Sequence, residues 1–185
     1  MRLLSILSLS AVTLLAAPPV TEKPFAAGGK VCLTLEAGGY TLEASPDDRL
    51  RVRCEGAEAE QVRVDIDTRG AEADIDVRRT PRGHFRAVIQ VPERTDLTIR
   101  MTAGELKVRG IVGHKDIKLR AGELDLAVPD PDAYRTVKAS VWAGEICASP
   151  WRSSKGGLFR SVALDGPGAY DLRAKLLAGQ ITFRK

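Results

Sequence analysis

Residues that build metal and cofactor sites are scarce in this chain of 185 residues. It has two histidines, His84 and His114, and three cysteines. A structural zinc site needs His and Cys ligands clustered at characteristic spacings, and both histidines instead lie in segments typical of turns. The Gly-Gly-x-Gly-x-Asp pattern of calcium-binding solenoid repeats is also missing. We therefore expect no metal ion and no cofactor.

Motifs of common enzymes are missing as well. The sequence has no Gly-x-Ser-x-Gly nucleophile elbow. The segment Gly166-Pro167-Gly168 lacks the Gly-Lys-Ser/Thr of a phosphate-binding loop. A Ser-His-Asp triad can be assembled in any chain order, but no serine here has a recognised nucleophile setting. We expect no catalytic residues and a protein that is not an enzyme.

The chain has no strong excess of one charge. Its formal net charge is +4, and basic and acidic residues are mixed along the sequence. Loss of the N-terminal segment with Arg2 would lower this by one, to +3. Mixed charge of this kind is typical of an ordinary solvated surface. The charge balance therefore gives no support for a nucleic-acid partner.

The N-terminal segment has the pattern of a secretory signal. Arg2 provides a positive start, Leu3 to Ala17 is an apolar run of 15 residues, and Pro18 and Pro19 follow. This run is short for a membrane-spanning helix, which needs ~20 residues. We expect residues 1–17 to be a signal peptide and 18–29 a linker, with an uncleaved N-terminal anchor as the alternative. The mature protein is then periplasmic or secreted, with no membrane span.

From residue 28 onward, hydrophobic residues alternate with polar ones. Examples are Val31, Leu33 and Leu35, then Val62, Val64 and Ile66, then Phe85, Ala87, Ile89 and Val91. This period of two predicts strands with one buried face, and turn formers such as Gly38-Gly39 separate them. No stretch shows a helical stripe. We predict an all-β protein with a β-rich N-terminal cap at residues 30–61.

A tetrapeptide recurs in the second half of the chain. The copies are Ala103-Gly104-Glu105-Leu106, Ala121-Gly122-Glu123-Leu124, Ala143-Gly144-Glu145-Ile146 and Ala178-Gly179-Gln180-Ile181. Their spacings are 121−103 = 18, 143−121 = 22 and 178−143 = 35 residues, the last close to two repeats with one degenerate copy between. Ala71 to Ile75 is interpreted as an earlier, imperfect copy. Serial repeats of this kind indicate stacked supersecondary units.

Each copy joins two alternating strands at a glycine, which suits a corner with positive φ or crowded backbones. Over residues 62–185 we therefore predict a single-stranded, β-helix-like solenoid, with a β-sandwich as the alternative. The glycines Gly104, Gly122, Gly144 and Gly179 are expected at equivalent corners of successive turns. The aliphatic residues then stack inside, and the acidic residues form an outward row that ends in Gln180. Such a row needs basic neighbours or, in a second interpretation, calcium.

The repeat carries a resemblance to a known family. An exported chain with serial Ala-Gly-Glu-Leu units, together with the closing stretches Gly156 to Ser161 and Gly166 to Ala174, resembles the bacterial "putative adhesin" (DUF4097-like) families over roughly residues 62–185. The resemblance implies a β-solenoid, a location in the cell envelope and a non-catalytic role. It supplies no catalytic residues.

The cysteines and one tryptophan are the remaining candidates for specific contacts. In an oxidising compartment, one disulfide and one free thiol is the simplest arrangement of three cysteines. Three pairings are possible, of which we favour Cys32–Cys54, and the alternative is that all three cysteines are free thiols. The objection is that Cys32 is out of register with its apolar neighbours, whereas Cys54 is in register. Trp151 with Arg152 is a candidate surface contact, and the alternative is that Trp151 caps the core.

The sequence favours an exported, non-catalytic envelope protein with a binding, adhesion-like or scaffolding role. Its partner would be an unidentified envelope protein or polysaccharide. One alternative is a β-helical polysaccharide-active enzyme, although fold does not give function. Another is a periplasmic regulatory or sensing partner.

Overall fold

The computed structural model describes residues 20–185, except for residues 57 and 82–84. Within that part of the chain, 12 strands form one open sheet. The short strands are β1 (Val20–Pro24), β2 (Lys30–Leu35), β3 (Gly38–Ser45), β4 (Arg49–Glu55), β5 (Arg63–Arg69), β6 (Glu72–Arg78) and β7 (Arg86–Pro92). The long strands are β8 (Asp96–Val108), β9 (Lys115–Ala127), β10 (Tyr134–Ala148), β11 (Ser153–Asp165) and β12 (Tyr170–Arg184). Three short 3-10 helices complete the elements: η1 (Ala59–Gln61), η2 (Pro131–Ala133) and η3 (Ser149–Trp151). The predicted all-β class is confirmed.

Four of the long strands consist of two alternating patterns joined at a glycine. In β8 the odd-numbered residues from Leu97 to Met101 are buried, whereas after Gly104 the buried residues are Leu106 and Val108. β9, β12 and β10 show the same one-residue shift. Without it, the second pattern would point its aliphatic side chains to the outer side. We call the part before each glycine the first arm and the part after it the second arm.

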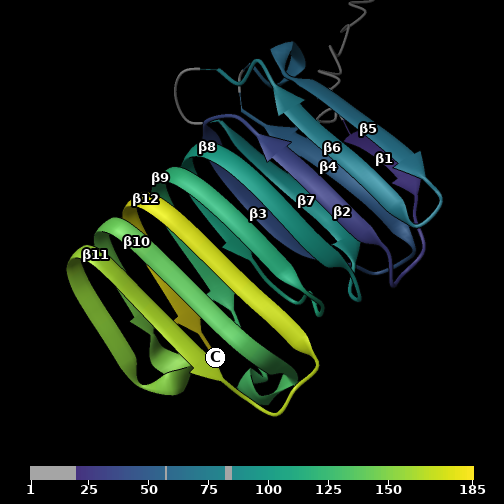
Figure 1. Cartoon of the computed structure of the whole chain (residues 1–185). Coiled ribbons are helices and arrows are strands. Elements are labelled where there is room, and N and C mark those ends of the chain that lie inside the picture. Colours follow the sequence, from purple (N-terminus) through teal and green to yellow (C-terminus); the bar gives the residue numbers. More distant parts are fainter. Residues whose placement is uncertain (1–19, 57, 82–84) are drawn as a thin grey trace, which may run out of the picture.

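The sheet is bent along these glycines, so that its two layers enclose the core. Figure 1 shows the long strands turning back near their middle. β2, β6 and β5 continue the first-arm layer beyond β8, and β3, β7, β4 and β1 continue the second-arm layer. The buried hydrophobic residues of both layers form one cluster. The pairs from β8 to β10 are parallel, whereas β11 runs antiparallel to β10, and β4 and β5 run antiparallel to their neighbours.

The bends stack with glycine directly on glycine. A Cβ on Gly122, where φ is +121°, would lie 1.9 Å from the carbonyl oxygen of Gly104. The corresponding distances are 1.9 Å from Gly179 to the Gly122 oxygen and 1.7 Å from Gly144 to the Gly179 oxygen. Any side chain would therefore force neighbouring strands apart, in addition to the cost of a positive φ.

The spatial order of the bends differs from the expected succession along the chain. β12 pairs with β9 on one side and with β10 on the other, so Gly179 lies between Gly122 and Gly144. The inner aliphatic row follows the same order: Leu106, Leu124, Ile181 and Ile146, each no more than 1% exposed. The last strand of the chain thus fills the middle of the stack.

Two further bends belong to the row. Gly38 is the register partner of Gly104, which makes Ala37-Gly38-Gly39-Tyr40 another copy of the motif, with Tyr40 beside Leu106. In β11, Gly157 is the partner of Gly144, so the degenerate copy expected between the last two motifs exists but runs antiparallel. The segment from Ala71, interpreted above as an early copy, instead starts β6 and pairs with β2. It does not lie at a bend.

The predicted cap at 30–61 is continuous with the rest of the sheet. β2 and β3 pair directly with the two arms of β8. The division of the chain at residue 62 stays a prediction about domains. The hydrogen-bonded sheet of the described residues has no break at this division.

The predicted disulfide is not formed. Cys32, Cys54 and Cys147 are free thiols. Cys54 points into the core from β4, and burial raises the pKa of its thiol. Cys32 lies on the outer side of β2, in a different layer of the sheet. A pair on opposite sides of the layers cannot reach disulfide geometry.

The predicted signal peptide at 1–17 and His84 lie outside the described residues. The predicted linker at 18–29 overlaps the described residues, where β1 occupies part of that range and pairs with β4. Among the described helices, none has the length and apolar character needed to cross a membrane.

Candidate functional site

The outer side of the second arms carries a row of acidic side chains. Glu105, Glu123, Gln180 and Glu145 are successive register partners on β8, β9, β12 and β10. The sequence placed Gln180 at the end of this row. It lies inside the row instead, because β12 is inserted between β9 and β10. The neutral amide therefore separates Glu123 from Glu145, and this reduces the repulsion between carboxylates on neighbouring strands.

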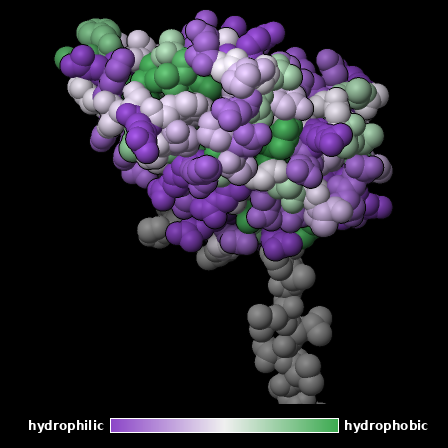
Figure 2. Space-filling model, turned by 90° about the horizontal axis from the view of Figure 1, so that it is seen from below, coloured by the Kyte–Doolittle hydropathy of each residue, from purple (hydrophilic) through white to green (hydrophobic). Residues whose placement is uncertain are grey.

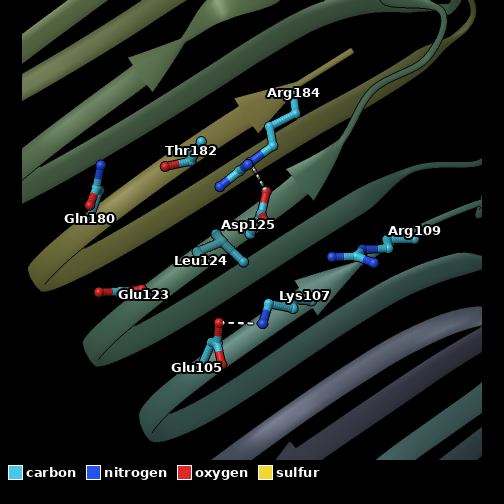
Figure 3. Close-up of a pocket in the computed structure, with 9 residues that line it drawn as sticks. All are labelled: Glu105, Lys107, Arg109, Glu123, Leu124, Asp125, Gln180, Thr182 and Arg184. Carbon is cyan, nitrogen blue, oxygen red and sulfur yellow. Dashed lines mark hydrogen bonds and ion pairs between the residues drawn. The ribbon is translucent and has the colours of Figure 1, made fainter.

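The next outward positions balance the acidic row with basic groups. The ammonium of Lys107 lies 2.5 Å from a carboxylate oxygen of Glu105, both on β8. The Nε of Arg184 donates to Asp125 across the β12–β9 pair, at 3.1 Å. Figure 3 shows these two ion pairs side by side, with the Arg109 side chain beyond Lys107. A basic neighbour thus offsets one member of the acidic row, Glu105, and Arg184 offsets Asp125 beside the row.

These side chains line a shallow groove of about 340 Å³. Its lining is Glu105, Lys107, Arg109, Glu123, Leu124, Asp125, Gln180, Thr182 and Arg184. Apart from Leu124, every one of these is a hydrogen-bond donor or acceptor. The groove crosses three strands, so donors and acceptors repeat at the strand spacing of ~4.8 Å. We call this site the polar groove.

The polar groove offers a polar chain several hydrogen-bond donors and acceptors. Two of its carboxylates, Glu105 and Asp125, each have a cation as ion-pair partner. In the described residues, no three His, Cys, Asp or Glu side chains are grouped closely enough to hold a metal ion.

The tryptophan proposed as a surface contact packs against the core. The ring of Trp151 lies edge-on to the buried ring of Phe183, with 5.7 Å between centroids. The adjacent Arg152 is exposed. Trp151 thus occupies the position that the capping alternative describes, and a contact made by Arg152 stays a prediction.

His114 has a local structural role. Its Nδ1 accepts a hydrogen bond from the backbone N–H of Asp171, at 3.0 Å. Its ring lies edge-on to Tyr170, with 5.6 Å between centroids. The histidine therefore links the residue that precedes β9 to the start of β12.

Sequence reasoning missed a buried lysine at the start of β9. Lys115 is 3% exposed, and its ammonium donates to the hydroxyl of Tyr134 at 2.7 Å and to the carbonyl of Gly113 at 3.2 Å. Burial lowers the pKa of Lys115 to about 8 and raises that of Tyr134 to about 12. The alternation of β9 was the available signal, since Lys115 is in register with Ile117 and Leu119. No groove described above reaches this pair, which we regard as structural.

Comparisons with known proteins show a fold shared with a solved structure, and they show no family. No protein-family model and no curated protein matches the chain. Among solved structures, "a putative cell adhesion protein" from Clostridium sporogenes is similar at a TM-score of 0.54 and 11% identity, over 90% of this chain and 98% of that one. "A putative adhesin" from Bacteroides fragilis is similar at a TM-score of 0.37 and 7% identity, over 94% and 100% of the two chains. At these identities, the first likeness shows a shared fold alone.

Proposed function

We propose that this protein is a non-catalytic binding or scaffolding protein of the cell envelope, and that the polar groove is its binding site. The stacked bends support the further inference that the sheet is a β-solenoid of the "putative adhesin" type, with antiparallel strands at its ends: β11 at one end, and β5 and the β1–β4 pair at the other. The signal-like N-terminus supports export to the periplasm or the cell surface.

The observation that carries the proposal is the repetition of outward polar side chains at one position of neighbouring strands. Glu105, Glu123 and Gln180 present acceptors and an amide at a constant spacing. A chain ligand with regularly repeated hydroxyl groups can meet such a row at several points at once, which adds up weak contacts. Polysaccharides of the envelope have this chemistry.

Binding and cleavage can be separated in one experiment. The chain lacking residues 1–17 is mixed with a panel of purified envelope polysaccharides, and heat of binding and release of reducing ends are measured in parallel. We expect binding to at least one polysaccharide without release of new ends. Release of ends would instead favour the β-helical enzyme.

A groove variant localises the binding. Arg109→Gln with Glu123→Gln changes two groove residues that have no ion pair among the described residues. Arg53→Gln with Glu58→Gln removes the same charges from exposed positions outside the groove. We expect the groove variant alone to weaken binding about tenfold or more, since each lost hydrogen bond to a charged group contributes ~1.5–3 kcal/mol. Equal loss in both variants would place the site elsewhere.

A further inference from the structure

The modest net charge conceals an uneven distribution on the outer side of the first arms. Six cations lie there on four neighbouring strands: Arg100 on β8, Lys118 and Arg120 on β9, Arg173 and Lys175 on β12, and Lys138 on β10. Arg100, Lys118 and Lys175 are successive register partners, and so are Arg173 and Lys138. We call these six residues the basic face.

None of the six cations of the basic face forms an ion pair among the described residues, although the outward Asp116 on β9 is the register partner of Arg173. The ion pairs of the described chain involve other cations, such as Arg63 with Asp65 and Arg69 with Asp67 on β5. Like charges that face each other on neighbouring strands destabilise a sheet. A surface that keeps them together is therefore complementary to an anionic partner, whose charges would relieve the repulsion.

A shallow groove of about 300 Å³ lies on the basic face between β12, β10 and β11. Its polar lining consists of Lys138, Arg173 and Lys175 with the hydroxyls of Ser140 and Ser161, and no carboxylate lines it. Ammonium and guanidinium groups together with hydroxyls are the donors that bind phosphate oxygens. The groove therefore fits a phosphate-bearing group.

Next to the basic face, hydrophobic side chains are exposed at the bend. Leu177, Trp142 and Phe159 occupy neighbouring strands at 50%, 51% and 71% exposure, and Leu158 is 60% exposed. In the view from below (Figure 2), hydrophobic residues gather toward the left, the side on which β10 and β11 lie in Figure 1. We call these four residues the apolar bend.

The shape of the apolar bend argues against a sugar platform. The rings of Trp142 and Phe159 lie 5.5 Å apart at 87°, so that one is edge-on to the other. A flat stacking surface needs rings whose faces are both open to the ligand. Bulky aliphatic and aromatic residues beside a cationic surface instead match the interface of a bilayer, where apolar groups enter and cations remain at the headgroups.

We propose that this protein docks on an anionic lipid membrane through its first-arm side. The apolar bend enters the boundary between headgroups and acyl chains, and the basic face binds lipid phosphates, with one headgroup in the groove at Lys175. This goes beyond the proposed function, because the polar groove lies on the other arm and stays free for a ligand. A soluble polyanion would satisfy the cations but leave the apolar bend in water.

Vesicle co-sedimentation of the chain lacking residues 1–17, which retains every described strand, tests the proposal. The vesicles contain equal parts phosphatidylglycerol and phosphatidylcholine, or phosphatidylcholine alone. We expect binding to the anionic vesicles only. The triple variant Lys138→Gln, Arg173→Gln, Lys175→Gln should lower the partition coefficient on the order of a hundredfold, at roughly fivefold per cation. The matched control Lys107→Gln, Arg109→Gln, Arg184→Gln removes equal charge from the polar groove and should lower it far less.

Insertion of the apolar bend has its own readout. The chain has two tryptophans, so Trp151→Phe leaves Trp142 as the single fluorophore. Its emission should shift to the blue on anionic vesicles and be quenched by brominated acyl chains. Phe159→Ser in the same background should weaken binding. Dextran sulfate serves as a soluble polyanion without a bilayer. Equal losses in both triple variants would overturn the proposal in favour of nonspecific binding. Binding to dextran sulfate, with no quenching on vesicles and no effect of Phe159→Ser on either target, would overturn it in favour of a polyanion-binding surface.

Discussion

The central strands and the terminal strand β11 share one register around the bend, but they place different kinds of residue at the inward positions. In β9, the inward positions around the bend are Leu119 and Leu124, which are 4% and 1% exposed. In β11 the corresponding inward positions are Arg160 and Lys155, partners of Val141 and Ile146 on β10. The same register thus holds a hydrophobic core in the middle of the stack and charged residues at its end.

The charged inward residues of β11 explain why the stack ends there. Lys155 donates to the carbonyl of Ser161 at 3.0 Å, and Arg160 donates to the carbonyl of Gly156 at 2.8 Å. Both side chains therefore occupy the place where a further strand would put aliphatic groups. Inward-pointing charges are a known protection of edge strands against pairing with other chains. The comparison teaches that position in the stack, more than the motif, decides the cost of a substitution.

The largest difference between centre and end should come from the glycines. Gly122→Ala places a Cβ 1.9 Å from the Gly104 carbonyl oxygen at positive φ. We expect a loss above ~4 kcal/mol in the free energy of unfolding, or no soluble protein, because the backbones of β8 and β9 must move apart. Gly156→Ala in β11, whose Cβ would have its nearest neighbour at 4.0 Å, should change stability by under ~1 kcal/mol. Urea denaturation followed by circular dichroism measures both.

Gly70→Ala separates the two causes of that loss. Gly70 has φ +62° and no atom within 4 Å of an added Cβ, so this variant shows the conformational cost alone, ~1–2 kcal/mol. If Gly122→Ala cost no more than Gly70→Ala, the contact between stacked glycines would not be a constraint.

The aliphatic row gives the next largest contrast. Leu124→Ala removes a fully buried side chain between Leu106 and Ile181 and should cost ~2–5 kcal/mol, as buried leucine truncations do. Leu158→Ala on β11 removes a side chain that is 60% exposed and should cost under ~0.5 kcal/mol. Equal losses in equilibrium denaturation would contradict the assignment of β11 as a solvated end.

Centre and end of the stack should also differ in the pH dependence of stability, because Lys115 on β9 is buried and Lys155 on β11 is exposed. Lys115 is buried with a pKa of about 8, below the ordinary 10.5. Between pH 8 and 10 the unfolded chain therefore binds more protons than the folded one, so stability should rise with pH, by about 2–3 kcal/mol from this group. Above pH 10 the raised pKa of Tyr134 acts in the opposite direction, because the unfolded state loses its proton first.

Lys115→Met should abolish the rise, whereas Lys155→Met, which removes an exposed lysine from β11, should leave it. Thermal unfolding at a series of pH values, compared with the unchanged chain, isolates the contribution of Lys115 from those of the tyrosines and Cys54. The interpretation fails if the Lys115→Met curve parallels that of the unchanged chain.

The smallest effect is expected on the outer row. Glu123→Gln replaces an exposed carboxylate that lies between Glu105 and Gln180. It should change stability by under ~0.5 kcal/mol, with a small gain if repulsion from Glu105 is relieved. A loss as large as that of Leu124→Ala, in the same denaturation assay, would show that the row faces the core rather than solvent.

Local features of this fold could be predicted from the sequence, and the long-range order could not. The alternation around Ala121-Gly122 predicts two strands joined at a bend, because side-chain period and glycine conformation are local properties. The place of β12 between β9 and β10 depends on which equivalent strands pair. The motifs at Gly122, Gly144 and Gly179 are too similar for their sequences to decide this.

The basic face could not be predicted from the sequence for a similar reason. Lys118 and Lys175 are 57 residues apart in the sequence (175−118 = 57) but are partners in the sheet, so their charges looked scattered among acidic residues. The available signal was that outward positions two to six residues before each motif glycine hold Arg or Lys on four strands. Only the register shows that these positions form one face.

The place of β12 has a consequence for how the chain reaches its folded state. In an ordinary repeat array, each unit contacts only its neighbours in sequence, so structure can grow from one end and loss of a terminal unit shortens the array. In the described sheet, β9 and β10 are joined only through β12, the last strand in chain order. We therefore expect a chain that ends at residue 165 to leave one edge of β9 and one edge of β10 unpaired.

Pairing of β12 with β9 joins residues that are far apart in the sequence, such as Lys118 and Lys175, and this predicts slow, high-contact-order folding. The sheet of such a chain cannot be completed before its final strand, β12, has been synthesised. If the chain is exported unfolded, as proposed above, such a delay would keep it unfolded while it crosses the membrane.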